Sequence, residues 1–149
     1  MNAYPALGPS AGLAPRGSRC HDPGVESMEE IVAREVGADG LAAMVAAFYR
    51  RVRTDDVLGP LYPEQDLEGA EKRLREFLQF RFLGHEVYVE NRGHPRLRMR
   101  HFPFAIGDKE VARWVELMEA AMDESGISGE AWSVMSPFFA QVAEFLKNR

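Results

Sequence analysis

The stretch Arg92-Gly-His-Pro-Arg-Leu-Arg-Met-Arg-His101 combines four arginines with two histidines, and Phe-Pro-Phe follows it directly. A histidine beside apolar neighbours can offer a neutral imidazole to a metal, most familiarly a haem iron. The basic residues around it can meet carboxylates at the edge of such a group. His101 is therefore the first candidate for an axial ligand.

His101 has rivals and a plainer interpretation. A single histidine is more often an ordinary surface or core residue than a metal ligand. Pro95 forces an extended or turn geometry on His94, which therefore belongs to a loop. His85 follows Gly84 in a predicted exposed loop, and His21 lies near the start of the chain. One cysteine and four scattered histidines do not show the paired spacing of a protein zinc site.

Outward from this stretch, apolar residues recur at helical spacing. The pattern predicts helices over 29–36, around 41–52, from about 67 to 83, over 95–101, from 108 to about 122, and a last one after Gly129. We expect a loop between Gly84 and Gly93, an N-cap at Asp108, and a last helix in which Pro137 produces a kink or marks the start with Ser136 as cap. No sustained alternation predicts strands. The fold class is all-α.

Composition sets the limits of function. A chain of 149 residues has the size of a single domain. Its net charge of −5 argues against general nucleic-acid binding, and no apolar run is long enough for a membrane span. The lone Cys20 excludes an internal disulfide and favours a reducing compartment, which together with the lack of a signal-peptide pattern predicts a cytoplasmic protein.

The beginning of the chain is rich in Pro, Gly, Ser and Ala. We predict a disordered N-terminal extension over residues 1–27 and a folded domain over 28–149. Met28 is a candidate for the true start of translation. The rival interpretation is a regulatory tail carrying Cys20 and His21.

The ten-residue stretch ending at His101 closely resembles the truncated haemoglobins, specifically their group II. Phe48-Tyr49, Leu61-Tyr62-Pro63 and Trp114 support this resemblance, as does the segment Ala70 to Leu74. It covers the chain from about Glu29 onward. The resemblance implies a shortened globin, with a two-over-two helical sandwich around haem b and His101 as the axial ligand.

The resemblance also assigns roles around the haem. Tyr49, Tyr62 and Trp114 would form the distal cluster that donates hydrogen bonds to a bound ligand, while Ala70 would leave room for ligand or water. The plainer interpretation is that the three aromatic residues fill a core. The other residues expected to contact the haem or its propionates are Arg73, Leu74, Phe77, Tyr88, Arg92, Met99, Arg100 and Phe104. We also consider Phe102, Ile106 and Met118 for the proximal side.

The arginine run has an alternative of its own. Arg92, Arg96, Arg98 and Arg100 can form a solvated basic face that pairs with nearby glutamates, which contributes little stability at a surface. An RNA-binding role lacks interleaved aromatic residues for stacking.

The sequence departs from the group II pattern at a few positions. Paired glycines are reduced to one at Val36-Gly37 and at Leu83-Gly84, and Phe82 stands where a tryptophan is frequent. These changes concern loop shape and packing at the haem edge, and they leave the ligand set intact.

Three functions follow as hypotheses. The first is reversible dioxygen binding at ferrous haem, for transport, storage or scavenging. The second is a haem enzyme acting on nitric oxide, peroxide or peroxynitrite, which needs an external reductase because this chain carries no reductase domain. The third is a helical interaction module without haem. The family favours a homodimer, although no feature of the sequence demonstrates one.

Overall fold

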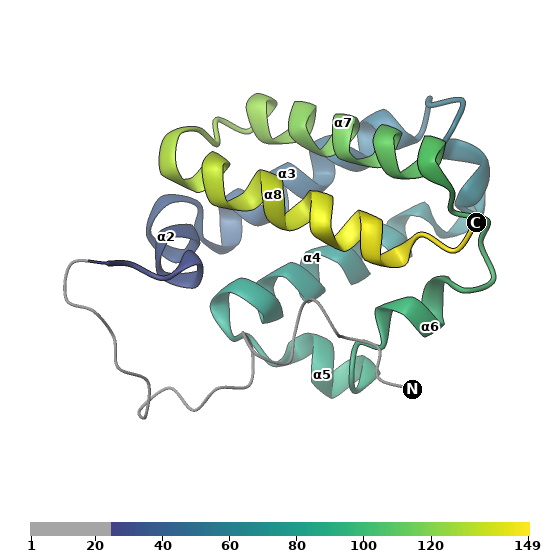
Figure 1. Cartoon of the computed structure of the whole chain (residues 1–149). Helices are drawn as coiled ribbons and strands as arrows, with labels where there is room; N and C mark the ends of the chain where they lie inside the picture. Colours follow the sequence, from purple (N-terminus) through teal and green to yellow (C-terminus); the bar gives the residue numbers. More distant parts are fainter. Residues whose placement is uncertain (1–24) are drawn as a thin grey trace.

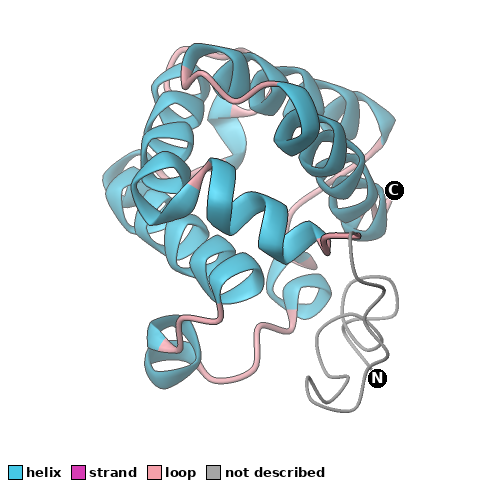
Figure 2. Cartoon of the chain, turned by 90° about the vertical axis from the view of Figure 1, so that its left-hand side faces the viewer, coloured by secondary structure: helices cyan, strands magenta, loops and turns pink. Residues whose placement is uncertain are grey.

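Helices follow one another through the whole described part of the chain (Figure 1). The computed structural model describes residues 25–149. The α-helices are α2 (Met28–Glu35), α3 (Gly37–Val52), α4 (Leu67–Leu83), α5 (Val87–Arg92), α6 (Leu97–His101), α7 (Asp108–Glu124) and α8 (Gly129–Leu146). Two single-turn 3-10 helices, η2 (Gly59–Leu61) and η3 (Glu64–Asp66), connect α3 to α4. Over this range the chain contains helices and loops but no strand, which confirms the predicted all-α class (Figure 2).

The four long helices enclose the core. Helix α3 packs against both α4 and α7, and α7 packs against α8, so that α3–α4 and α7–α8 form two helix pairs. Phe48, Met118 and Phe139, one from each of α3, α7 and α8, are almost completely buried. The apolar stripes that the sequence places at helical spacing are thus the faces that meet in the core.

A capping box formed by Ser27 and Glu30 fixes the start of the first described helix. The Ser27 hydroxyl accepts a hydrogen bond from the Glu30 amide at 3.1 Å, and the Glu30 carboxylate accepts one from the Ser27 amide at 2.8 Å. This reciprocal pair satisfies two amides at the helix start. Helix α2 therefore begins at Met28. The predicted extension over 1–27 falls mainly on residues 1–24, which lie outside the described residues together with Cys20 and His21, so it stays a prediction.

Arg81 connects α2 to the end of α4. Its side chain is only 9% exposed, and its guanidinium forms an ion pair of 2.6 Å with Glu29 of α2. The same group lies over the ring of Phe138, 5.2 Å from the centroid, and over that of Phe82 at 5.7 Å. The end of α4 follows at Gly84, whose φ of 74° is a left-handed conformation that glycine adopts without strain.

Three local predictions are wrong. The segment between Gly84 and Gly93 is not all loop, because Val87–Arg92 forms α5 and buries Tyr88 against Phe77 and Phe80. A six-residue helix is too short to show a clear period, and its packing determines its structure.

The other two errors concern the caps of the last two helices. Gly107, and not Asp108, is the N-cap of α7, where its amide donates to the Glu110 carboxylate at 2.9 Å. Helix α8 begins at Gly129 and contains Pro137, so Pro137 does not mark its start, and Ser136 is no cap but donates to Glu119 at 2.6 Å. The other alternative, a kink at Pro137, stays a prediction. The buried face of α8 outweighs the local preference of proline. None of the helices in 25–149 is long and apolar enough to cross a membrane.

Candidate functional site

A deep cavity opens between the two helix pairs, closed on its remaining side by α5 and α6. Its volume is about 390 Å³, within the range of roughly 300–1,000 Å³ typical of sites for small molecules and cofactors. Twelve of the thirteen residues predicted to contact haem or ligand line it: Tyr49, Tyr62, Ala70, Arg73, Leu74, Phe77, Tyr88, Arg92, Arg100, His101, Phe104 and Trp114. The structure therefore brings together residues that are far apart in the sequence.

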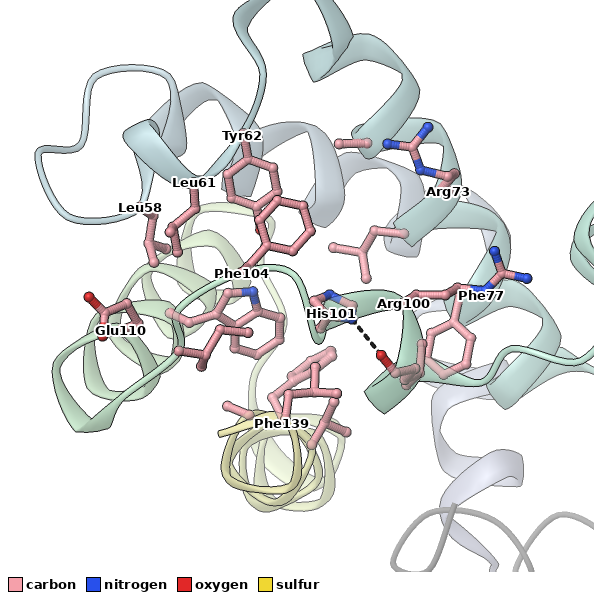
Figure 3. Close-up of a pocket in the computed structure, with 18 of the residues that line it drawn as sticks. Leu58, Leu61, Tyr62, Arg73, Phe77, Arg100, His101, Phe104, Glu110 and Phe139 are labelled. Carbon is pink, nitrogen blue, oxygen red and sulfur yellow. Dashed lines mark hydrogen bonds between the residues drawn. The ribbon is translucent and has the colours of Figure 1, made fainter. Parts of the chain in front are cut away.

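His101, the last residue of α6, stands in this cavity (Figure 3). Its Nδ1 lies 2.8 Å from the Leu97 carbonyl oxygen, one helical turn earlier. A carbonyl only accepts, so Nδ1 carries the proton and Nε2 keeps its lone pair. Burial lowers the pKa of His101, against the Leu97 hydrogen bond that raises it. The imidazole is therefore held neutral, with its ring orientation fixed in the manner typical of metal-ligating histidines.

Three aromatic side chains with polar ends form a second group in the cavity. The rings of Tyr49 and Tyr62 meet edge to face at 5.5 Å, and Trp114 packs between Phe48 and Phe139. Burial raises the pKa of both tyrosines, while hydrogen bonds from Tyr49 and Trp114 act to lower that of Tyr62. Both phenols therefore keep their protons. The cluster gathers two hydroxyls and an indole N–H in a mostly apolar space, with Tyr49 and Trp114 hydrogen-bonded to Tyr62.

The loop that carries Tyr62 is held at Asp55, a buried carboxylate that follows the end of α3. Asp55 Oδ2 accepts hydrogen bonds from the amides of Val57 and Leu58 at 3.0 and 2.9 Å. Its Oδ1 accepts from Arg113 of α7 at 2.6 Å. Burial acts to raise the pKa of Asp55, but these hydrogen bonds outweigh it and hold the pKa below its usual value.

Because of Asp55, the free energy of unfolding should decrease as the pH falls. A carboxyl with a lowered pKa stabilises the fold above its unfolded pKa of about 3.9 and loses that contribution as pH falls through the folded value. Asp55→Asn should lower the free energy of unfolding at pH 7 by about 2 kcal/mol, and its value should then decline less between about pH 5 and 3 than in wild type. Urea unfolding across this range is the measurement. Exposed Asp56→Asn is the control, and equal pH 7 stabilities for wild type and Asp55→Asn would refute the assignment.

Cations border the cavity on the side of α4 to α6, where Figure 3 shows Arg73 and Arg100 near Phe77. Arg73 is paired with Asp66 at 2.8 Å, and Arg100 donates to the carbonyls of Pro95 and Arg92 at 2.7 and 2.9 Å. Gly69 leaves space for the first pair, because a Cβ there would lie 2.2 Å from Asp66 Oδ1 and 2.9 Å from Arg73 Nη1.

Arg92 supplies the observation that tests whether a haem fits. Its Nε is buried and, within residues 25–149, has no hydrogen-bond partner. A buried N–H without a partner is costly. The Nε of Arg81 is in the same condition outside the cavity, so it is the position of Arg92 in the cavity lining that relates its N–H to a ligand. The side chain lines the cavity at the same border as Arg73 and Arg100. An anionic edge, such as the propionates of a haem, matches this set of donors, and the apolar walls match a porphyrin.

Some residues considered for the haem site do not line the cavity. Met99 was predicted to contact the haem, but it does not line the cavity and is 58% exposed. In a helix, residues two apart do not share a face, so α6 turns Met99 away when it directs His101 inward. Phe102 is likewise 72% exposed, and Met118 is fully buried in the core away from the cavity wall. The possible pairing of the arginine run with glutamates is replaced by bonds of Arg98 and Arg100 to main-chain carbonyls.

Other cavity residues were not identified from the sequence as part of the site. The lower wall in Figure 3 includes Phe139 of α8, and its neighbours Phe138 and Val142 also contribute. Leu58 and Leu61 close the side opposite Arg73. The sequence marks all of these only as core residues, because an apolar side chain at helical spacing does not distinguish a cavity wall from a filled interior.

Comparison with known proteins gives consistent matches. A family model described as bacterial-like globin matches residues 34–147. The group 2 truncated haemoglobin YjbI of Bacillus subtilis is 38% identical over 95 residues, covering 64% of this chain and 71% of that protein. The haemoglobin of the thermophilic phototrophic bacterium Chloroflexus aurantiacus has 42% identity and a TM-score of 0.75, covering 79% of this chain and 98% of that one.

A second solved structure gives the same result. The truncated oxygen-avid haemoglobin from Bacillus subtilis is 32% identical with a TM-score of 0.74, and the match covers 78% of this chain and 98% of that one. The structure is thus similar to two-over-two globin folds, as the sequence predicts.

Proposed function

Because this chain belongs to the bacterial-like globin family, as a group II truncated haemoglobin, we propose that it holds haem b through His101 and binds dioxygen reversibly. One observation carries the proposal: His101 presents a neutral imidazole, oriented by the Leu97 carbonyl, to a cavity with apolar walls. When bound, haem supplies a ferrous iron at which a diatomic ligand can coordinate reversibly.

Different residues of the chain would bind different parts of the haem. His101 would be the axial ligand, and Arg92, with Arg73 and Arg100, would meet the propionates. Phe77, Leu74 and Phe104 would enclose the ring and exclude water. These roles are supported by the orphaned Nε of Arg92 and by the shared border on which the three arginines lie.

The aromatic cluster would control the bound ligand. Tyr49 and Tyr62 keep their protons because burial raises their pKa values, and Trp114 has a donor that cannot become an acceptor. Preorganised donors in an apolar site stabilise developing negative charge on a ligand. This arrangement favours slow release, and therefore scavenging or storage over rapid transport. Ala70 would leave a passage for the ligand.

A haem enzyme acting on nitric oxide, peroxide or peroxynitrite is the second candidate. The observation that favours it is the same group of hydrogen-bond donors, which would stabilise negative charge on a reacting oxygen species as well as on bound dioxygen. Such turnover requires an external electron donor. The rate at which the oxygenated protein consumes nitric oxide, measured with a supplied reductase, separates the two functions. Sustained turnover would favour the enzyme, and its absence in a protein that binds oxygen would favour the oxygen-binding function.

The proposal is tested by purifying the protein with haem and recording absorption spectra of the ferric, ferrous and oxygenated forms. We expect an intense Soret band and an oxygenated form that persists when free oxygen is removed, because the donors slow ligand release. A protein that is helical by circular dichroism but takes up no haem would contradict both haem functions. Only a helical interaction module would then remain.

A further inference from the structure

The connection from α6 to α7, residues 102–107, is fastened to the residues that follow α8. The Asn148 and Arg149 amides donate to the Ile106 carbonyl at 2.8 and 3.1 Å. In return, the Ile106 amide donates to the Asn148 side-chain oxygen at 3.0 Å. Figure 1 shows the C-terminal end of the chain lying against this connection. Segments far apart in the sequence are thus joined beside the cavity by three hydrogen bonds, two between main-chain groups and one to the Asn148 side chain; we call this set the ladder.

The Asn148 side chain extends this ladder to the candidate axial ligand. Its Nδ2 donates to the Phe104 carbonyl at 2.8 Å and lies 3.5 Å from the His101 carbonyl oxygen. The His101 carbonyl also accepts from the Phe104 amide at 3.0 Å. Phe104 lines the cavity, and its ring centroid is 6.4 Å from that of His101. One amide side chain therefore joins Ile106, Phe104 and His101.

A second contact joins α6 to α8. Arg98 donates through Nη1 to the Phe145 carbonyl at 2.8 Å, and its guanidinium lies 5.8 Å from the Phe145 ring centroid. The contacts of Asn148 and of Phe145 therefore both join α6 to the last residues of the chain. Helix α6 is consequently held by hydrogen bonds to the end of α8 and to the residues that follow it.

Helix α6 needs such external support. It is five residues long, and a single helical turn is not stable by itself in water. Leu97 is its one buried residue, whereas Met99 and the following Phe102 are exposed. The position of the helix is therefore determined more by hydrogen bonds from its neighbours than by apolar packing of its own.

We propose that Asn148 is a positioning residue for the proximal histidine. By holding the carbonyls of His101 and Phe104, it fixes the end of α6 and hence the placement of the imidazole that would bind the iron. The inference rests on the proposed haem function. A positioning residue differs from a merely structural one in its effect on the bond between histidine and iron. In a structural role, replacing Asn148 would lower the global stability and leave that bond unchanged.

The test compares three variants with wild type. Asn148→Ala removes every side-chain bond of the ladder, whereas Asn148→Asp keeps an acceptor for the Ile106 amide and loses the donor to the two carbonyls. Arg149→Ala is the matched control, because it keeps the main-chain bond to Ile106. Three quantities are measured: the iron–histidine stretching band of the ferrous protein by resonance Raman, the rate of haem loss to an apomyoglobin acceptor, and amide hydrogen exchange over residues 102–107 in the protein as purified.

For Asn148→Ala we expect a shifted and broadened iron–histidine band, faster exchange over 102–107, and haem loss accelerated roughly tenfold, as follows from losing one or two hydrogen bonds. Asn148→Asp should reproduce the band shift, and Arg149→Ala should match wild type. Faster exchange with an unchanged band and unchanged haem loss would overturn the proposal. A wild type without a Soret band would instead be the failure of the haem function itself, recognisable because no variant would bind haem either.

Discussion

Replacing His101 with glycine is expected to remove the normal axial ligation and to weaken haem binding by more than about 100-fold, since even residues behind a metal ligand are worth roughly 10–100-fold. The physical reason is that, among the histidines of residues 25–149, His101 is the one that lines the cavity, with its imidazole held neutral and its Nδ1 bonded to the Leu97 carbonyl. Titration of the protein with haem, followed by absorption spectra of the ferrous form, measures both effects. Adding free imidazole should restore the ligated spectrum, because glycine leaves space for it.

The matched controls for this variant are the other described histidines. His85 and His94 are exposed and do not line the cavity, so His85→Ala and His94→Ala should keep the wild-type spectra. Loss of the ligated spectrum in His94→Ala, together with its survival in His101→Gly, would reassign the axial ligand to His94.

Trp114→Phe should accelerate oxygen release about 10- to 100-fold, the range expected when one hydrogen bond to a charged acceptor is lost. Phenylalanine keeps an aromatic ring for packing on Phe48 and Phe139 but removes the indole N–H. The off-rate is measured by stopped-flow mixing of the oxygenated protein with carbon monoxide. An unchanged off-rate would show that Trp114 only fills space.

Trp132→Phe is a suitable control for this substitution. Trp132 also donates through its indole, to Asp123 at 3.1 Å, but it does so at the surface and away from the cavity. The same chemical change there should leave oxygen release at the wild-type rate. A general loss of stability from replacing tryptophan would instead affect both variants.

The residues of the candidate site were predictable through the family resemblance. The apolar and basic surroundings of His101 make it a candidate ligand, and only the resemblance favours it over an ordinary surface or core histidine. The structure places His101 in the cavity with eleven other predicted residues, and their contacts with haem stay a prediction. Met99 is exposed because residues two apart on a helix do not share a face, so a helix that directs His101 inward turns Met99 outward. The predicted helix over 95–101 already implied this relation. The start of α6 at Leu97, after Arg96 with its positive φ of 44°, is what no local pattern predicts.

Long-range polar contacts could not be predicted. Arg113 reaches Asp55 across 58 positions, and Asn148 reaches Ile106 across 42. Asp55, Arg113 and Asn148, taken alone, resemble ordinary polar residues of a loop or helix surface, and Ile106 takes part only through its backbone. Only the packing of α7 and α8 brings the partners together, and hydropathy patterns contain no information about such pairs. The same reason hides Phe139 as a cavity wall.

Gly69 has a consequence for how this protein can diverge. A Cβ at that position would lie 2.2 Å from Asp66 Oδ1 and 2.9 Å from Arg73 Nη1, so the ends of these two side chains would have to shift. A substitution of glycine by alanine is conservative on a helix surface by the usual measures. Here it would require the Asp66–Arg73 pair beside the cavity to rearrange. The smallest side chain in the sequence thus limits the geometry of an ion pair in which it takes no part.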